Sequence, residues 1–510
     1  MKLFRKMKKK ISVLIKSVLF CSAVSTGMVM AQSTNSTITK KEITLEEVLK
    51  IASKNSLDAF KAKRQIEYSY WEYKAFKASL LPKITFNTSP ATYRSTVVER
   101  YDSNLNQDVF RPVQSLNSYA GVSLSQNIMQ TGGTISLNST YNQLFNYNNG
   151  LTKRYSATPV SISLNQPLMA YNGFKWNQKT APLEYEKAQK ALVFELQRIN
   201  VKTVQYFFAW ALAAKKEEMA QENLNSSKKL YDIGKKRYEI GSIEKEDLLN
   251  LELQLYNAEI EVTTQKRNLL EVKNELKIFL RNDLAKVDTP VLPELISSLK
   301  IDIDNAMELY KTNNPNMLDL EISKIEAERD LDRAIKDNRF DLSLSASYGL
   351  NQQADEFAQV YQNLLNQNLV AVNFKIPVLD WGERRGNIKK ARMNKEVQEI
   401  DMEQEKSKLE QEMISKVRDF NLQERLVLNA LRANKISRES YALTEQRFLE
   451  GRVDLLKLTS SLNAWQTSNE SYMSKLSNYW RYYYEIQQYT LYNFQEQRPL
   501  EVDFEKGILE

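Results

Sequence analysis

Side chains that could act as nucleophiles, proton carriers or metal ligands are few in kind in this chain. Its 510 residues contain no histidine and a single cysteine, Cys21. A Ser-His-Asp triad and imidazole metal sites are therefore excluded. The 63 acidic residues leave carboxylate chemistry, such as a general acid and base pair, as the remaining option. No spacing marks such a pair, and carboxylates in a helical chain mostly lie on solvated faces. We therefore predict no enzyme, no cofactor and no metal site.

The amino terminus predicts export from the cytoplasm. Basic residues precede an apolar stretch at 17–30, and segment 29–31 offers small residues at a cleavage position, which is typical of a Sec signal peptide spanning residues 1–31. A lipoprotein signal that uses Cys21 is an alternative, but the large Phe20 fits that cleavage poorly. A retained membrane anchor is another, but the apolar run is shorter than the usual span of about 20 residues. We expect the mature protein to begin at Gln32 and to carry no lipid.

Removal of this peptide changes the charge of the protein. Seven of the 71 basic residues and none of the 63 acidic residues lie within residues 1–31, so the remaining chain has a formal charge of +1. The basic character of the full chain is thus mostly that of the peptide, and it gives no support to nucleic-acid binding. Cys21 is lost as well, which excludes disulfides, thiolate metal sites and a cysteine nucleophile.

A block of the chain occurs twice. Pro167 ends an alternating run and Gly241 follows 74 residues later, while Pro377 and Gly451 repeat the same spacing 210 residues further along. Such a shared spacing indicates an internal duplication. The predicted repeat is a strand, a long helix, a tight turn and a second helix.

The scarcity of proline and glycine between these positions predicts long helices. The first, at 178–240, would be roughly 95 Å long at the usual rise per residue. A helix of this length implies a coiled coil or a tube. Two shorter helices placed end to end would match each long one, which would give a uniform wall. The predicted helices are 56–81, 178–240 and 243–281 in the first half and 316–339, 384–450 and 453–494 in the second.

Two of these helices carry an unbroken heptad pattern, with mostly apolar residues at alternating steps of three and four. This pattern indicates helices that pack along their length at a shallow angle, although core stripes of an ordinary bundle remain an alternative. The positions are Leu248, Leu251, Leu255, Ala258, Val262, Gln265, Leu269, Val272, Leu276 and Phe279 in the first helix, and Leu455, Leu458, Leu462, Trp465, Asn469, Tyr472, Leu476, Tyr479, Tyr483 and Ile486 in the second.

Segments between the helices alternate between apolar and small polar residues, as strands do. In a soluble sheet the apolar face would be core, whereas in a transmembrane barrel it would face lipid. The export signal, the lack of an apolar helix long enough to span a bilayer and tyrosines near strand ends favour the barrel. We predict six strands, near 83–97, 117–129, 134–147, 158–167, 341–350 and 368–377.

The first half holds an additional hairpin. Pro82 and Pro167 are 85 residues apart, whereas Asp341 and Pro377 are only 36 apart. The additional residues include a turn at 131–133 between two alternating segments, which predicts a β-hairpin. It either joins the barrel wall or caps the outer mouth.

Several short motifs, in this order within the duplicated frame, resemble the TolC-like outer-membrane channels of bacterial efflux and type I secretion. The resemblance covers about 43–494 and lies in segments 43–47, 80–82, 166–168, 313–315 and 376–378 together with the Gly241 and Gly451 turns. It implies a mixed α+β membrane protein: a homotrimer whose chains share one transmembrane β-barrel, continuous with a long periplasmic α-helical coiled-coil barrel. Typical members are thought of as having four strands per chain, so six would give eighteen in a trimer.

The domains that follow are the signal peptide 1–31, a first repeat at 32–282, a linker at 283–303, a second repeat at 304–494 and a tail at 495–510. The resemblance implies that the linker and the tail form a belt around the cylinder. It also implies a passive exit channel in the outer-membrane lipid, which receives substrate from a periplasmic adaptor and an inner-membrane RND or ABC transporter. An envelope scaffold or adhesin, and a periplasmic hydrolase, are alternatives from other classes.

The resemblance places the closing of the tunnel and the adaptor contact at the two glycine turns. The implied contact residues are Gly241, Ser242, Ile243, Leu248, Gly451, Arg452, Val453, Leu455 and Leu456. The candidate gate consists of Asp247, Asp454 and Lys457, through an Asp247–Lys457 ion pair or one between Asp454 and Arg452. Lys457 and Ser460 depart from the acidic residues of better-known members. The leucines Leu248 and Leu455 could instead simply begin the heptads.

Overall fold

The computed structural model describes residues 41–103, 106–147, 150–281, 287–296 and 299–501. The predicted signal peptide, Cys21 and the expected start at Gln32 lie outside the described residues, as do parts of the linker and of the tail. From Glu42 onward the chain forms one compact unit. None of the described helices combines the length and the hydropathy needed to cross a bilayer.

The helices confirm the internal duplication. Each half contains two short helices, one very long helix and one of intermediate length, and the corresponding lengths agree to within one residue. The first half has α2 (Leu45–Asn55, 11 residues), α3 (Leu57–Ser79, 23), α4 (Gly173–Glu239, 67) and α5 (Lys245–Phe279, 35). The second has α6 (Ile303–Asn313, 11), α7 (Pro315–Asp337, 23), α8 (Glu383–Leu449, 67) and α9 (Leu455–Thr490, 36).

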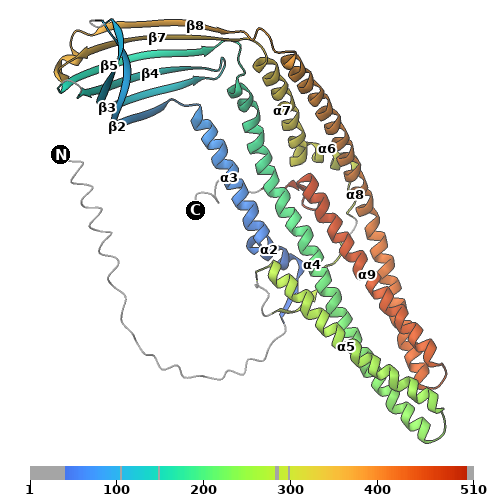
Figure 1. The fold of residues 1–510 in the computed structure, drawn as a ribbon. Coiled ribbons are helices and arrows are strands. Elements are labelled where there is room, and N and C mark those ends of the chain that lie inside the picture. Colours follow the sequence, from blue (N-terminus) through green and yellow to red (C-terminus); the bar gives the residue numbers. More distant parts are fainter. Residues whose placement is uncertain (1–40, 104–105, 148–149, 282–286, 297–298, 502–510) are drawn as a thin grey trace, which may run out of the picture. The chain divides into compact units, whose positions relative to one another are not determined.

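Each long helix is flanked by shorter ones along its length (Figure 1). The first part of α4 contacts α3, where Lys202 pairs with Asp58 at 2.6 Å. Its later part contacts α5, where the rings of Tyr206 and Phe279 lie 5.0 Å apart. The same division is seen in the second half, where α8 packs against α7 and then α9. The predicted matching of two shorter helices to one long helix is confirmed.

Local hydrogen bonds decide where the long helices begin. The side chain of Asn172 accepts a hydrogen bond from the backbone of Lys175, so α4 begins at Gly173, five residues before the predicted start. At α8, Asp380 accepts hydrogen bonds from the backbone and the side chain of Arg384. The Arg384 guanidinium, followed by the backbone amides of Arg384 and Gly382, lowers the pKa of Asp380 to about 2. The carboxylate therefore stays charged and caps the helix.

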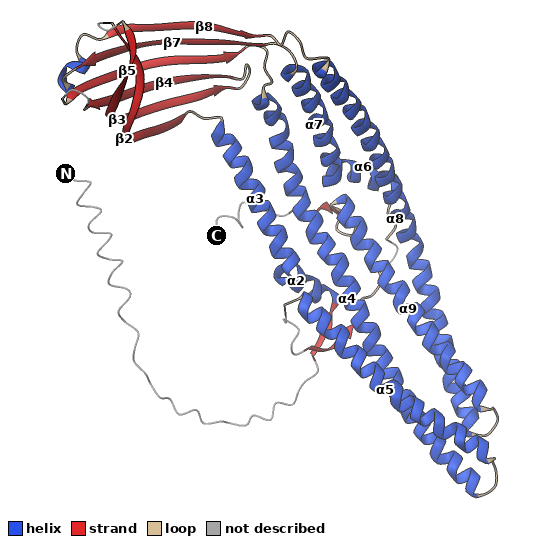
Figure 2. Cartoon of the chain, in the orientation of Figure 1, coloured by secondary structure: helices blue, strands red, loops and turns tan. Residues whose placement is uncertain are grey.

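The strands form one six-stranded antiparallel sheet (Figure 2). Its order is β2-β3-β4-β5-β7-β8, so the two halves of the chain meet where β5 pairs with β7. The prediction of six strands is confirmed, and so is the additional hairpin, because β4 pairs with β3 along the whole length of β4. The bounds are β2 (Lys83–Asp102), β3 (Gln107–Ile128), β4 (Gly133–Asn146), β5 (Thr152–Pro167), β7 (Asp341–Ala354) and β8 (Leu365–Lys375).

Short elements complete the chain. They are the 3-10 helix η1 (Phe357–Tyr361) and four short strands, β1 (Lys41–Thr44), β6 (Val287–Val291), β9 (Tyr492–Asn493) and β10 (Arg498–Pro499). The pair β9 and β10 corrects one boundary. We predicted that the last helix runs to residue 494, but α9 ends at Thr490 because Leu491 adopts a left-handed φ of 50°. The chain then turns back, and the Leu500 amide donates to the Leu491 carbonyl at 2.8 Å.

The main hydrophobic core lies where α2, α4, α6, α8 and α9 meet the end of α5. Its largest fully buried side chains include Trp210, Phe207, Phe420, Tyr479 and Tyr310. The predicted heptad positions supply much of this packing. Of the ten positions in α5 none is exposed, and in α9 eight of ten are buried. Both heptad predictions are thus confirmed at the level of the faces that these helices bury.

Candidate functional site

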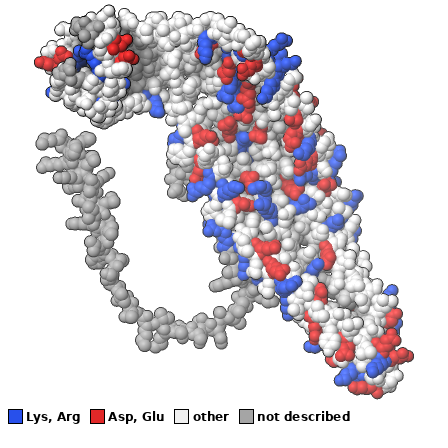
Figure 3. Space-filling view, viewed as in Figure 1, with Lys and Arg blue, Asp and Glu red and all other residues white. Residues whose placement is uncertain are grey.

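The sheet has two unlike faces. Ile84 and Phe86 on β2 and Val370 and Val372 on β8 lie on one face, which we call the apolar face, and these side chains are 65–74% exposed. Figure 3 shows that charged side chains are dense over the helices and sparse over the strands. Hydrophobic side chains in a soluble sheet pack into a core. An exposed apolar face argues against that alternative and is what lipid contact requires.

The opposite face, the polar face, is lined by small hydrogen-bonding residues. Ser136 on β4 and Ser163 on β5 are joined by a hydrogen bond of 2.7 Å, and Ser123 on β3 donates to Asn138 at 2.6 Å. A cavity of about 460 Å³ lies on this face, lined by residues of β2, β3, β4, β5 and β7. Because five strands line one cavity, the polar face is the concave side of the sheet.

The two glycine turns have the same geometry. Gly241 and Gly451 have φ of 73° and 76°, which only glycine adopts readily. In each turn the glycine amide donates to the carbonyl three residues back, at 2.9 Å, and the next amide donates to the carbonyl five residues back. This pattern is a Schellman motif. The sequence therefore repeats a helix-ending device, together with its spacing.

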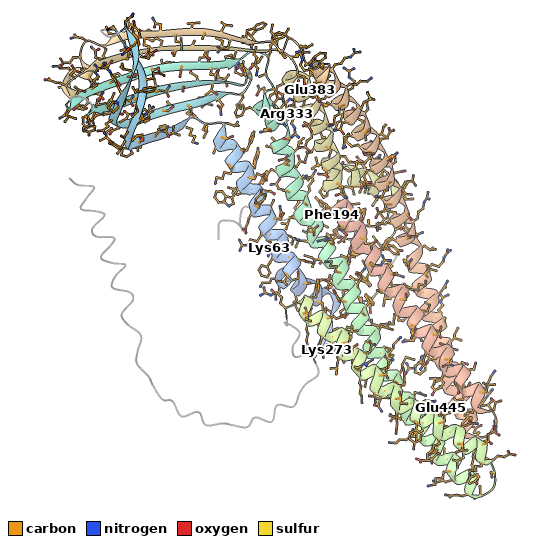
Figure 4. The ribbon with its side chains drawn as sticks, viewed as in Figure 1. Lys63, Phe194, Lys273, Arg333, Glu383 and Glu445 are labelled. Atoms are coloured by element: carbon orange, nitrogen blue, oxygen red, sulfur yellow. The ribbon has the colours of Figure 1, made fainter. Side chains whose placement is uncertain are left out.

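The turns also lie against each other. Arg237, near the end of α4, donates a hydrogen bond from Nη2 to the Leu449 carbonyl at 2.8 Å, and its guanidinium lies beside Gly451. Ser226 of α4 donates to Glu445 of α8 nearby, and Figure 4 marks Glu445 at this end of the helices. Nothing in the sequence pattern singled out Arg237, because its role depends on a carbonyl more than 200 residues away.

The predicted contact residues lie together at these turns with different exposures. Gly241, Ser242, Gly451 and Arg452 are exposed, while Ile243, Leu248, Val453 and Leu455 are half-buried. Leu456 is 80% exposed and, like Ile240 at 78%, presents an apolar side chain to solvent. Sequence reasoning missed Ile240. Its position just before the glycine of a helix-ending motif was the available signal.

The two acidic residues of the candidate gate serve as helix caps within the chain. Asp247 accepts a hydrogen bond from the Glu244 amide at 3.4 Å, and Asp454 accepts one from the Lys457 amide at 2.8 Å. Arg452 forms an ion pair with Glu450 at 3.3 Å rather than with Asp454. Among the residues that the structure describes, no ion pair joins Asp247 to Lys457. Both carboxylates therefore stabilise the start of their own helices. The Lys457 side chain is exposed.

A buried charge network between α8 and α9 was not foreseen. Glu485 accepts hydrogen bonds from Lys416 and Arg481, both at 2.8 Å, although the residue is only 8% exposed. Tyr489 in the same network donates a hydrogen bond to Glu412. Burial is the largest cause, and this carboxylate the next, of a Tyr489 pKa above its ordinary value. Figure 4 labels Phe194 of α4, whose ring lies 5.9 Å from that of Tyr489. The network thus sits where three helices meet.

Comparison with known proteins agrees with this architecture. A family model described as Outer membrane efflux protein matches residues 48–280 and 307–479. No curated protein gives a significant match. Among solved structures, the chain is similar to the CmeC outer membrane channel of Campylobacter jejuni, with 16% identity, a TM-score of 0.60 and 96% of each chain covered.

Two further structures have the same fold. The outer membrane protein VceC of Vibrio cholerae has 12% identity and a TM-score of 0.60, with 90% of this chain and 97% of that chain covered. A membrane protein from Pseudomonas aeruginosa has 15% identity and a TM-score of 0.62, with 88% and 90% covered. At these identities the similarity concerns the fold, which is that of TolC-like outer-membrane channels.

Proposed function

Because the chain belongs to the outer membrane efflux protein family, located in the outer membrane, we propose that it is the passive exit channel of a tripartite efflux pump or a type I secretion system. It conducts substrate from an inner-membrane RND or ABC transporter and a periplasmic adaptor to the exterior. The observation that carries this proposal is the sheet with an exposed apolar face and a concave polar face. Lipid outside and water inside are the two media that such a sheet requires.

The channel is a homotrimer in this proposal. The sheet of one chain is open, with β2 and β8 as unpaired edges. On the helices, Leu249, Leu253, Tyr256 and Ile260 of α5 are more than half exposed and follow heptad spacing. This second stripe points away from the seam with α4 and is suited to pack against another copy. A ring of identical subunits can thus pair the two strand edges and bury the exposed stripe of α5.

Three such chains supply eighteen strands, six from each. The hairpin of β3 and β4 lies inside the sheet, between β2 and β5, rather than at its border. Both edges of this hairpin are therefore paired within the chain. This supports a place in the wall and not only over the outer mouth. The linker and the tail form the belt around the helical cylinder in the same proposal.

The glycine turns are the adaptor contact. Leu456 and Ile240 are exposed apolar residues at these turns, and an adaptor's helical hairpin can bury them. The gate rests on contacts between chains, where Asp247 of one subunit meets Lys457 of the next. Asp247→Asn with Lys457→Gln removes both charges and keeps an acceptor for the cap at position 247. We expect this double variant to raise single-channel conductance, and an unchanged conductance would reject the latch.

Conductance of the purified mature protein in planar lipid bilayers tests the channel itself. We expect discrete single-channel steps from the unaltered trimer, whereas an envelope scaffold or adhesin gives none. Val372→Arg places a charge on the apolar face and should prevent insertion, at a cost of about 2–4 kcal/mol for each residue near mid-membrane. The adjacent Asn373 lies on the polar face, so the Asn373→Arg variant should still insert and conduct. A trimer without conductance, or equal behaviour of the two variants, would contradict the proposal.

A further inference from the structure

The polar face of the sheet carries charges of almost one sign. Strand register assigns each charged side chain to a face, because residues alternate and cross-strand partners share a face. Arg94 is opposite Ser115, and Arg154 is opposite Leu144, all on the polar face. Among the described side chains, those with charge on this face are Lys83, Arg94, Arg111, Arg154, Lys375 and Asp341. Five are cationic and one is acidic.

Arg94 and Arg154 stand together in this set. Both line the cavity of about 460 Å³ on the polar face, and the other side chains that line it are uncharged. In the described part of the chain, neither guanidinium has an ion-pair or hydrogen-bond partner. A guanidinium cannot lose its proton in a protein, so these charges persist at every physiological pH. They are therefore available to a solute that passes along this face.

Among the side chains that the structure describes, the acidic residues of the sheet do not balance these two charges. Asp341 is opposite Lys375, where β7 begins and β8 ends. Glu99 is opposite Phe110 and Asp108 is opposite Tyr101, which register assigns to the apolar face. Each of these acidic groups is thus paired with a cation or separated from the two arginines by the sheet itself.

We propose that the polar face of the sheet forms a cationic passage that favours anionic solutes over cationic ones, with Arg94 and Arg154 as the residues that determine this selectivity. The inference rests on the proposed channel function, because it needs water and ions on the polar face. Rings of arginine or lysine make a pore favour anions. Charges act on passing ions over a Debye length of about 8 Å at physiological ionic strength, and repetition in each subunit multiplies the effect.

Reversal potentials measured across a potassium chloride gradient test this inference. We expect the unaltered channel to pass chloride more readily than potassium. The double variant Arg94→Gln with Arg154→Gln should lower the ratio of anion to cation permeability at least twofold, and more strongly at low salt, where screening is weak. The conservative pair Arg94→Lys with Arg154→Lys should retain the selectivity, because the charges remain.

Lys153→Gln provides a matched control. Lys153 is adjacent to Arg154 but lies on the apolar face, with its ammonium 5.8 Å from the centre of the Phe145 ring. Its substitution should leave the permeability ratio unchanged. A glutamine double variant that conducts with the ratio of the unaltered channel, or a Lys153→Gln variant that shifts as far, would refute this inference alone. An unaltered protein that inserts and does not conduct would refute the channel function on which it rests.

Discussion

Substitution of Asn314 measures the strength of the contact between the start of α7 and the end of α9. Its side chain is fully buried and makes two hydrogen bonds. The oxygen accepts from the Asn316 amide at 2.9 Å and so caps α7, while the nitrogen donates to the Tyr489 carbonyl, also at 2.9 Å. Asn314→Ala removes both bonds. The corresponding residue of the first repeat, Ser56, is also fully buried, and its hydroxyl only caps α3 by accepting from the Ala59 amide.

Comparison of substitutions at Ser56 and Asn314 separates the free energy of the cap from that of the bond to Tyr489. Loss of a cap typically costs about 1 kcal/mol, which is the expected effect of Ser56→Ala. A buried carbonyl left without its donor costs about 1–3 kcal/mol more. Asn314→Ala should therefore lower the free energy of unfolding by about 2–4 kcal/mol. Asn314→Ser keeps an acceptor for the cap and loses only the donor to Tyr489, so it should fall between the two.

Urea unfolding in detergent, followed by the loss of helical circular dichroism, gives these free energies. All variants are compared at one protein concentration, because assembly adds to apparent stability. An Asn314→Ala midpoint that coincides with that of Ser56→Ala would show that the bond to Tyr489 contributes nothing. An Asn314→Ser midpoint as low as that of Asn314→Ala would show that a hydroxyl does not replace the amide as a cap.

Three other predictions concern separate parts of the chain. Burial first, and then the charges of Glu72 and Glu326, raise the pKa of Glu184. The folded state therefore holds this proton more tightly than the unfolded chain does. The stability that this proton contributes is lost as the pH rises above about 4, the usual pKa of a glutamate. Glu184→Gln should raise the melting temperature near pH 7 and have little effect near pH 4. Glu222 is exposed, so Glu222→Gln should leave the melting temperature unchanged at both pH values. Gly349→Ala should weaken the sheet, because the added Cβ would lie 2.8 Å from the Val160 carbonyl oxygen. Gly386→Ala, on the open surface of α8, should stabilise the protein by about 1 kcal/mol. Thermal unfolding measures the opposite shifts of these two variants. Intact-mass measurement should find a mature protein that begins at Gln32 without lipid, and an acylated Cys21 would reject this processing.

Local patterns in the sequence determined the helices, the strands and the duplication. Proline and glycine positions and the change from two-residue to heptad periodicity depend on near neighbours, so they predicted both long helices to within five residues and the presence of all six strands. The strand ends were predicted less well, and β3 begins at Gln107, ten residues before its predicted start. The prediction was wrong at the end of α9, where Leu491 takes a left-handed conformation that glycine usually supplies. A non-glycine residue gives no such signal, because it is the following β-hairpin that holds this conformation.

Only the tertiary structure decided which side chains meet. The sequence showed alternating residues but not whether the apolar face would be packed or exposed, since both arrangements share one pattern. Asp247 and Asp454 have the charges of a gate, yet they cap their own helices at the distances observed. Arg94 and Arg154 lie far apart in the chain and line one cavity because the register of the three intervening strand pairings sets their faces and the curvature of the sheet brings them together. Register and curvature arise from contacts between distant segments, which no local pattern contains.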